Sequence, residues 1–170
     1  MPELPDLQVF SRNLDKKLSG KTVKKVTAVN DKKLNVSKNE LKKSIEDQML
    51  NKIYREDKEL HFEFENGNVL GLHLMLNGDL YLFKETNEHK HPIIELIFDD
   101  GTGLVLTDFQ GAATPTLNPD PRNAPDALSK EADFDFLKEQ LRKKKTTVKN
   151  FLLDQNMIRG IGNAYADEIL

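Results

Sequence analysis

Residues 51–83 run NKIYREDKELHFEFENGNVLGLHLMLNGDLYLF, and this stretch decides the fold class. Apolar side chains alternate with polar ones, as in half-buried β-strands, over 51–55, 60–65, 69–75 and 79–83. Asn66-Gly67 and Asn77-Gly78 separate three of these segments, and Asn-Gly favours tight hairpin turns. Consecutive strands joined by tight turns run antiparallel, so the stretch predicts an antiparallel sheet.

Further elements are expected on both sides of this stretch. Strands are predicted over 22–30, 93–98 and 104–107. Helical spacing of Leu4, Leu7, Phe10, Leu14 and Leu18 predicts an opening helix, and a second helix over 37–49 would be capped by Ser37. The first part of the chain is therefore expected to form an antiparallel β-sandwich or flattened barrel opened by a helix.

The character of the sequence changes near residue 117. Helices are predicted over 133–141 and 146–153, and another helix follows the glycine turn Arg159-Gly160-Ile161-Gly162-Asn163. A turn of this kind suits backbone amides that bind a phosphate. The fold class is thus α+β, divided into a sandwich domain at 1–117, a Pro-rich linker at 118–132 and a helical segment at 133–170.

Composition narrows the class of protein. The 170 residues include no cysteine, which excludes disulfides and a thiolate zinc site within them. No apolar stretch approaches the roughly 20 residues that span a bilayer, and the start lacks a signal-peptide core, so a cytoplasmic protein is expected. The net charge of -3 gives no general case for nucleic acid. Clustered lysine pairs suit either a phosphate-binding face or a merely soluble surface.

The N-terminus carries a possible nucleophile. Once Met1 is removed, Pro2 becomes a free secondary amine beside the Glu3 carboxylate, and such an amine can attack an aldehyde-like carbon to form an iminium. A proline after the start methionine is also common in proteins without this chemistry. The motif alone therefore leaves an inert surface residue as the alternative.

Four stretches together point to a family. They are Pro2-Glu3-Leu4-Pro5-Asp6, the hairpin Arg55–Leu60 with Lys58 near its tip, His73-Leu74-Met75-Leu76-Asn77-Gly78, and Lys143–Leu170 with its glycine turn. In this order and spacing the chain resembles the formamidopyrimidine-DNA glycosylase and endonuclease VIII family of base-excision repair enzymes. The last stretch resembles the family's helix-two-turn-helix module. The resemblance implies a DNA glycosylase with lyase activity at abasic sites.

The resemblance also assigns catalytic roles. Pro2 corresponds to the nucleophile that attacks C1′ of the damaged nucleotide, expels the base and forms a Schiff base, after which elimination cleaves the strand. Glu3 corresponds to the acid that protonates the opening sugar, and Lys58 to a lysine that contacts the damaged site. Considered without the resemblance, Lys58 is a solvated lysine at the end of a strand.

The resemblance also implies DNA-contacting residues, in the second half of the chain and in the turn that contains His91. Lys149 and Asn163 correspond to residues that clamp phosphates beside the lesion, and Lys144 to a further backbone contact. His91 corresponds to a histidine that contacts DNA, although an ordinary surface histidine is the alternative. His89 and His91 have no third ligand nearby, so no metal site is predicted.

The sequence departs from the family where three side chains fill the space left by the flipped nucleotide. The family methionine aligns with Leu76, although Met75 is adjacent. The family arginine becomes Gln110, which is kept as a DNA-binding candidate, and the phenylalanine becomes Ala112. Phe109 is the nearby aromatic side chain. The void-filling candidates are therefore Leu76, Met75 and Phe109, and this departure weakens lesion recognition more than chemistry.

Length is the second departure. Family members continue with further helices and a zinc or zincless finger, so no cofactor is expected within this chain and any zinc finger lies beyond Leu170. The end at Ile169-Leu170, inside an expected helix, favours a fragment over a naturally trimmed relative. The expected partner is damaged double-stranded DNA, bound by a monomer at the bacterial nucleoid, with no membrane. The alternatives are a catalytically silent DNA-binding relative and a protein-interaction domain.

Overall fold

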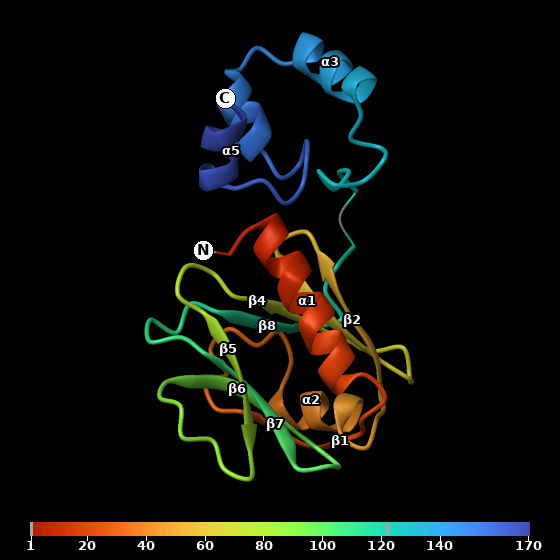
Figure 1. Ribbon diagram of the computed structural model, residues 1–170, viewed down its shortest axis with the longest axis vertical. Helices are drawn as coiled ribbons and strands as arrows, with labels where there is room; N and C mark the ends of the chain where they lie inside the picture. Colours follow the sequence, from red (N-terminus) through yellow and green to blue (C-terminus); the bar gives the residue numbers. More distant parts are fainter. Residues whose placement is uncertain (1, 122) are drawn as a thin grey trace.

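The computed structural model describes residues 2–121 and 123–170, which form a β-sandwich and a helical module (Figure 1). Met1, whose removal the predicted amine chemistry requires, lies outside the described residues. The sandwich part comprises α1 (Leu4–Leu18), β1 (Val23–Ala28), α2 (Lys38–Ile45), β2 (Leu50–Glu56), β3 (Glu59–Phe64), β4 (Val69–His73), β5 (Asp79–Lys84), β6 (Pro92–Phe98), β7 (Thr102–Thr107) and β8 (Thr114–Leu117). The helical module comprises α3 (Phe134–Lys143), α4 (Val148–Leu153) and α5 (Asn163–Ile169).

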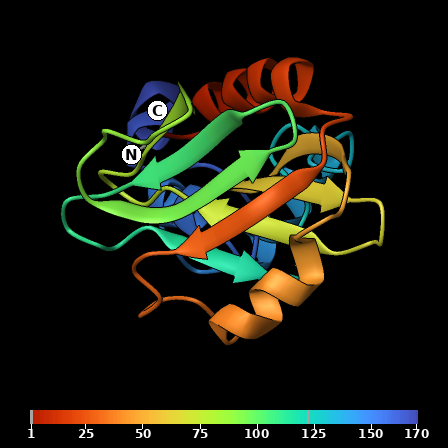
Figure 2. The ribbon, with the colours of Figure 1, turned by 90° about the horizontal axis from the view of Figure 1, so that it is seen from below.

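Two four-stranded antiparallel sheets make the sandwich, in the orders β1-β6-β7-β5 and β2-β3-β4-β8. Apolar side chains of both sheets fill the space between them, and Phe62, Phe64 and Phe98 are fully buried there. Helix α1 packs against β2 and α2 against β1, and the two helices lie at opposite edges of the sandwich (Figure 2). The predicted α+β class, with an opening helix, an antiparallel sandwich and a helical module, is confirmed.

Strand β8 was not predicted from the sequence. It is only four residues long and contains Pro115, which lacks a backbone N–H and therefore weakens any strand pattern. The strand nevertheless pairs with β4, and it lies at the edge of its sheet, where a proline is tolerated. This extra strand completes the second sheet and fixes where the preceding loop, 108–113, returns to the sandwich.

Strand register gathers several loops at one end of the sandwich. Glu59 pairs with His73 and His73 with Thr114, so the β2–β3 turn and the loops 74–78 and 108–113 lie at the same end. Thr107 pairs with both Asp79 and Pro92, which brings the end of the β5–β6 loop to the same place. Figure 1 shows the loops 74–78 and 108–113 adjacent to each other, on the side of the N-terminus. All predicted site residues of the sandwich beyond residue 3 therefore lie at this end.

Part of the predicted linker 118–132 is built into the helical module. Ala127 donates its N–H to the carbonyl of Arg159 at 3.0 Å, and Arg159 donates its N–H to the carbonyl of Pro125 at 2.9 Å. Ala127 and Ala132 pack against the core of the module. The linker between the sandwich and the helical module is consequently shorter than the predicted 118–132.

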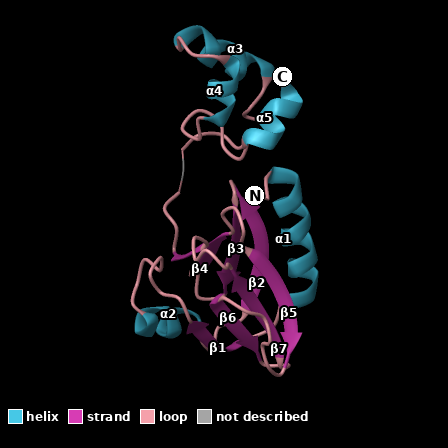
Figure 3. Ribbon diagram, turned by 90° about the vertical axis from the view of Figure 1, so that its left-hand side faces the viewer, coloured by secondary structure: helices cyan, strands magenta, loops and turns pink. Residues whose placement is uncertain are grey.

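The N-terminus belongs to both parts of the molecule. Helix α1 begins beneath α5 (Figure 3), and the Leu4 side chain, only 5% exposed, lies in the core of the helical module with Phe151, Leu152, Ile158, Ile161 and Ala166. The rest of α1 packs on the sandwich through Leu7, Leu14 and Leu18. One helix thus ties the two cores together through its first turn.

Two ion pairs add to this junction, and the first of them is largely buried. The Arg55 guanidinium on β2 binds both carboxylate oxygens of Asp126, at 2.6 and 2.8 Å, and the two side chains are only 7% and 14% exposed. Burial raises the pKa of Asp126, but the hydrogen bonds from Arg55 and the Leu128 N–H outweigh it and leave that pKa lowered. Arg159 of the helical module pairs with Glu56, next to Arg55.

Breaking the Arg55–Asp126 pair should destabilise the protein. Arg55→Met leaves the Asp126 carboxylate buried without its main partner, so we expect a loss of about 3 kcal/mol or more in the free energy of unfolding, measured by urea denaturation. The combined Arg55→Met and Asp126→Leu variant should recover much of that loss. As the control, Lys52→Met removes the exposed Lys52–Glu63 pair and should change stability by less than about 1 kcal/mol.

Candidate active site and nucleic-acid interface

The Glu3 side chain binds the start of helix α5. Its carboxylate accepts hydrogen bonds from the backbone N–H groups of Gly162 (3.1 Å), Ala164 (3.1 Å) and Tyr165 (3.2 Å). The residue is 4% exposed. The first N–H groups of a helix have no partner within it and carry a partial positive charge, so a carboxylate is a favourable partner there. Glu3 therefore caps α5 although the two lie 161 positions apart in the sequence, counted from Glu3 to Ala164.

This contact corrects one expectation from the sequence. The glycine turn before α5 was expected to offer its backbone amides to a phosphate, but the amides of Gly162, Ala164 and Tyr165 are bound by Glu3. The amides of the turn do bind an anionic group, as the sequence predicts. The anion is an internal carboxylate, and only the fold brings it there.

The two glycines of the turn are required by close approach. A β-carbon at Gly162 would overlap the Glu3 carboxylate, and one at Gly160 would overlap the Leu4 side chain. Gly160 also has φ of +96°, a conformation that side chains disfavour. The glycines therefore let residues 3 and 4 lie directly against the turn.

Pro2 and Lys58 lie at the junction of the two parts. Pro2 is half-buried and immediately precedes Glu3, whose carboxylate anchors it beside α5. Lys58 is half-buried in the β2–β3 turn, after Asp57, which has φ of +56°. That turn lies at the end of the sandwich where α1 begins (Figures 1 and 3). The structure thus brings the predicted catalytic residues to the same end of the sandwich.

The predicted phosphate-binding residues all lie in the helical module. Asn163 is the first residue of α5 and is exposed, Lys149 is the second residue of α4, and Lys144 caps the end of α3. Both lysines are paired with carboxylates, Lys149 with Asp167 and Lys144 with Asp154 at 2.9 Å. Sequence analysis did not foresee these acidic partners, because only the packing of the helices creates them.

The void-filling candidates occupy two neighbouring loops. Leu76 is 64% exposed and Phe109 is 65% exposed, so both apolar side chains are open to a ligand. Met75 is half-buried with φ of +54°, and its N–H donates to Nδ1 of His73 at 3.0 Å. His73, which sits on a strand of the sandwich, thus helps to set the backbone that presents Leu76.

Asp108 builds the second of these loops. Its carboxylate accepts the N–H groups of Gln110 (2.9 Å), Ala112 (2.8 Å) and Ala113 (2.8 Å), and its own N–H donates to the His91 carbonyl at 3.0 Å. Burial raises the pKa of Asp108, but these backbone hydrogen bonds together lower it further than burial raises it. Gln110 and His91 are both exposed beside this loop, so the structure brings them together with Phe109.

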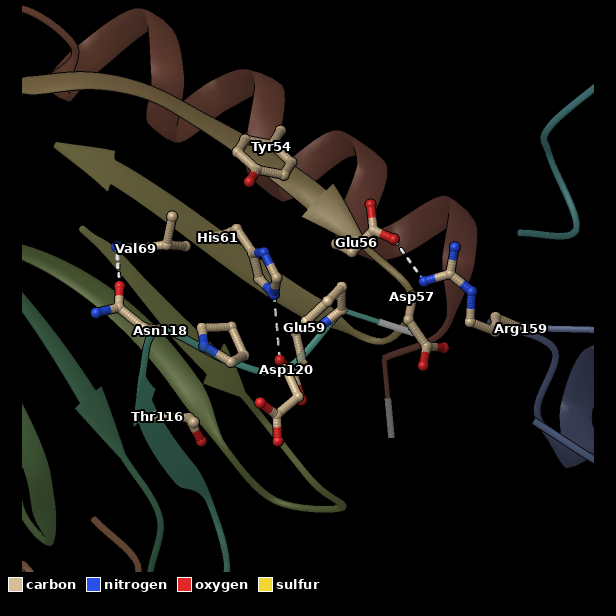
Figure 4. Close-up of a pocket in the computed structure, with 12 residues that line it drawn as sticks. Tyr54, Glu56, Asp57, Glu59, His61, Val69, Thr116, Asn118, Asp120 and Arg159 are labelled. Carbon is tan, nitrogen blue, oxygen red and sulfur yellow. Dashed lines mark hydrogen bonds and ion pairs between the residues drawn. The ribbon is translucent and has the colours of Figure 1, made fainter. Parts of the chain in front are cut away.

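A polar pocket of about 650 Å³ lies on the outer face of the second sheet (Figure 4). Glu56, Asp57, Glu59 and Asp120 supply carboxylates to it, and the His61 ring lies 3.2 Å from the Glu59 carboxylate. None of the predicted catalytic or DNA-binding residues lines it. Because carboxylates repel phosphates, this pocket is not where a DNA backbone would lie.

Comparison of the sequence with protein-family models identifies a family. The family model of the formamidopyrimidine-DNA glycosylase N-terminal domain matches residues 1–114, and the model of the formamidopyrimidine-DNA glycosylase H2TH domain matches residues 124–170. The chain belongs to the formamidopyrimidine-DNA glycosylase family. The H2TH match begins at Ala124, which agrees with the packing of residues 124–132 on the helical module.

Individual family members are similar over the whole chain. The formamidopyrimidine-DNA glycosylase of Ligilactobacillus salivarius is 31% identical over 189 aligned positions, and that of Mycoplasma genitalium is 36% identical over 183. Each alignment covers 100% of this chain, but only 65% and 63% of the relatives. The chain therefore spans a little under two thirds of the length of these formamidopyrimidine-DNA glycosylases.

Solved structures of the family have the same fold. The Lactococcus lactis formamidopyrimidine-DNA glycosylase, non-covalently bound to DNA containing an abasic site, superimposes with a TM-score of 0.90 at 26% identity. The match covers 99% of this chain and 67% of that protein. A second structure, of the same enzyme with an N7-benzyl-Fapy-dG-containing DNA, gives a TM-score of 0.89.

The zinc finger found in some formamidopyrimidine-DNA glycosylases does not fit the residues present. The chain has no cysteine, and residues 2–121 and 123–170 contain no group of three or more His, Asp or Glu side chains that could hold a metal ion. In the same described residues, no helix is both long and apolar enough to cross a membrane.

Removing the space for Glu3 should release α5. Gly162→Ala displaces the Glu3 carboxylate, so both the carboxylate and three amides lose their partners, and we expect stability to fall by about 3 kcal/mol. Hydrogen exchange at the Ala164 and Tyr165 amides should accelerate as well. Glu168→Gln, an exposed change on the same helix, serves as the control. Unchanged exchange at both amides in Gly162→Ala would contradict the anchoring role of Glu3.

The Asp108 carboxylate should stabilise its loop in a pH-dependent way. Since its pKa is lowered on folding, its contribution is present above the ordinary aspartate value of about 3.9 and is lost as pH falls through the lowered value. Asp108→Asn, which resembles the protonated form, should lose about 2 kcal/mol at pH 7 by urea denaturation, and the difference should shrink towards pH 3. The exposed change Asp99→Asn is the control, and a difference independent of pH would refute this account.

Proposed function

We propose that this chain is the catalytic part of a base-excision repair DNA glycosylase with lyase activity at abasic sites, acting on damaged double-stranded DNA. The observation that carries the proposal is the Glu3 carboxylate bound to the first turn of α5. This contact holds Pro2 close to the helix that begins with Asn163. A nucleophile and a phosphate-binding residue are thereby kept in a fixed relation, as an enzyme acting on a nucleotide requires.

Pro2 supplies the nucleophile in this proposal. After removal of Met1 its nitrogen is a secondary amine, which attacks C1′ of the damaged nucleotide while the base leaves with the bonding electron pair. The nitrogen then gives up its proton, the C1′–O4′ bond of the sugar breaks with its electron pair passing to O4′, which takes up a proton, and the nitrogen lone pair completes an iminium with C1′. Loss of a proton from C2′ then allows elimination of the 3′-phosphate, which cleaves the strand, and water finally releases Pro2.

Glu3 can combine an anchoring role with a proton-transfer role. Its Oε2 accepts two backbone hydrogen bonds, from Gly162 and Tyr165, but Oε1 accepts one, from Ala164. A carboxylate oxygen has two lone pairs, so Oε1 retains the capacity to exchange a proton with the sugar oxygen as the ring opens. Lys58, at the same end of the sandwich, is proposed to contact the damaged site.

Binding of DNA is assigned to the face of the helical module and to the loops at the end of the sandwich. Lys149, Asn163 and Lys144 are proposed to hold backbone phosphates, and His91 and Gln110 to contact DNA beside the 108–113 loop. The exposed Leu76 and Phe109 are suited to fill the space left by a flipped nucleotide, with Met75 as the neighbouring candidate.

The amine chemistry needs no cofactor, so none is proposed for these residues. Action as a monomer in the cytoplasm, at the nucleoid of a bacterium, stays a prediction from the sequence. The relatives named above are bacterial proteins, which supports the bacterial source alone.

Borohydride reduction tests the proposal directly. It converts an iminium between Pro2 and abasic-site DNA into a stable amine, so a covalent protein–DNA adduct should form and be visible on a denaturing gel. Pro2→Gly should form much less adduct, and a chain with an extra residue before Pro2, whose nitrogen is then an amide, should form none. An adduct that persists with the extension would refute the role of Pro2. Salt-dependent DNA binding without any adduct would instead support a silent DNA-binding relative.

A further inference from the structure

Lys149, a proposed phosphate-binding residue, is held by a carboxylate of its own module. Its ammonium group pairs with Asp167, which lies one turn into α5. The side chains are 41% and 62% exposed, so DNA can reach the pair. A phosphate that binds Lys149 must therefore displace or share the ammonium group with Asp167.

Asp167 also lies near the other phosphate-binding residue of α5. Asn163 and Asp167 are four residues apart in this helix, so their side chains occupy the same face. A phosphate held jointly by Asn163 and Lys149 would consequently approach the negative charge of Asp167. The Asp167 carboxylate therefore both pairs with Lys149 and repels the phosphate that Lys149 is proposed to bind.

The same arrangement recurs at the end of α3. Lys144 binds Asp154 at 2.9 Å, and this hydrogen bond together with the Asn156 N–H holds the pKa of Asp154 below its ordinary value. Asp154, however, also caps the turn after α4 through Asn156, so substituting it would alter the turn. Asp167 is the carboxylate whose effect on DNA can be tested cleanly.

We infer that Asp167 is an affinity-determining residue. Its carboxylate competes with DNA for Lys149, so the Lys149–Asp167 ion pair must break before Lys149 can bind a backbone phosphate. The inference rests on the proposed function, since it concerns the same DNA-binding face. Its consequence is a weaker hold on the backbone of any duplex, which leaves more of the discrimination to the contacts at the lesion.

The test measures binding of the full chain to a duplex oligonucleotide with one abasic site, by fluorescence anisotropy over a series of salt concentrations. Asp167→Asn should bind about two- to fivefold more tightly, the range expected for release from an exposed ion pair. The slope of log affinity against log salt should also steepen by up to about one, because Lys149 then neutralises a phosphate without leaving an unpaired carboxylate.

Two controls separate this effect from a general change of charge. Glu168→Gln removes the same charge from the neighbouring exposed position of α5 and should change the affinity much less. In a Lys149→Met background, Asp167→Asn should raise the affinity clearly less, since no ion pair with Lys149 remains to be broken and only the repulsion between Asp167 and the phosphate is removed.

Three results would overturn the inference while leaving the proposed function intact. They are an equal gain from Glu168→Gln, an undiminished gain in the Lys149→Met background, or a loss of affinity in Asp167→Asn, which would make Asp167 a positioning residue for Lys149. If the unsubstituted chain shows no salt-dependent binding to DNA at all, the proposed function fails as well.

Discussion

The hydrogen bonds between the Glu3 carboxylate and the first turn of α5 are the constraint on which the candidate site depends. N-terminal residues are usually the least ordered part of a domain, because little holds them in place. Here residue 3 is buried and satisfies three amides of a helix in the other part of the molecule. A terminal amine can serve as a nucleophile only if it is held in place, and this contact supplies that restraint.

The same contact explains why the two parts of the chain depend on each other. Leu4 completes the core of the helical module, while the remainder of α1 packs on the sandwich. The Arg55–Asp126 and Arg159–Glu56 pairs then fix the junction from the side of β2. Since the groups proposed for chemistry come from the sandwich and those for phosphate binding from the helices, the rigidity of this junction sets the geometry of the whole site.

Local sequence patterns predicted most of the elements but not the contacts between them. The Asn66-Gly67 turn joins β3 and β4 into a hairpin, as its short-range chemistry predicts. The hairpin predicted at Asn77-Gly78 is wrong, because β4 and β5 on either side of it belong to different sheets and do not pair. Strand β8 was missed because it is short and contains Pro115. The Glu3 cap on α5 and the Lys149–Asp167 pair could not be predicted, because they join residues that are distant in sequence and carry no local signal. Motifs provided the candidate site residues, whereas only the fold shows what each of them contacts.

The loop at 108–113 shows how this chain can differ from its family without losing its framework. Asp108 organises the loop entirely through backbone N–H groups, which every residue except proline supplies. The side chains of Gln110 and Ala112 contribute nothing to these bonds, so the residues at these two positions can change without removing a hydrogen bond from the loop. What changes is the surface that the loop presents, now dominated by the exposed Phe109. The surface proposed to contact the lesion can thus diverge while the position of the loop relative to His91 and the sandwich is retained.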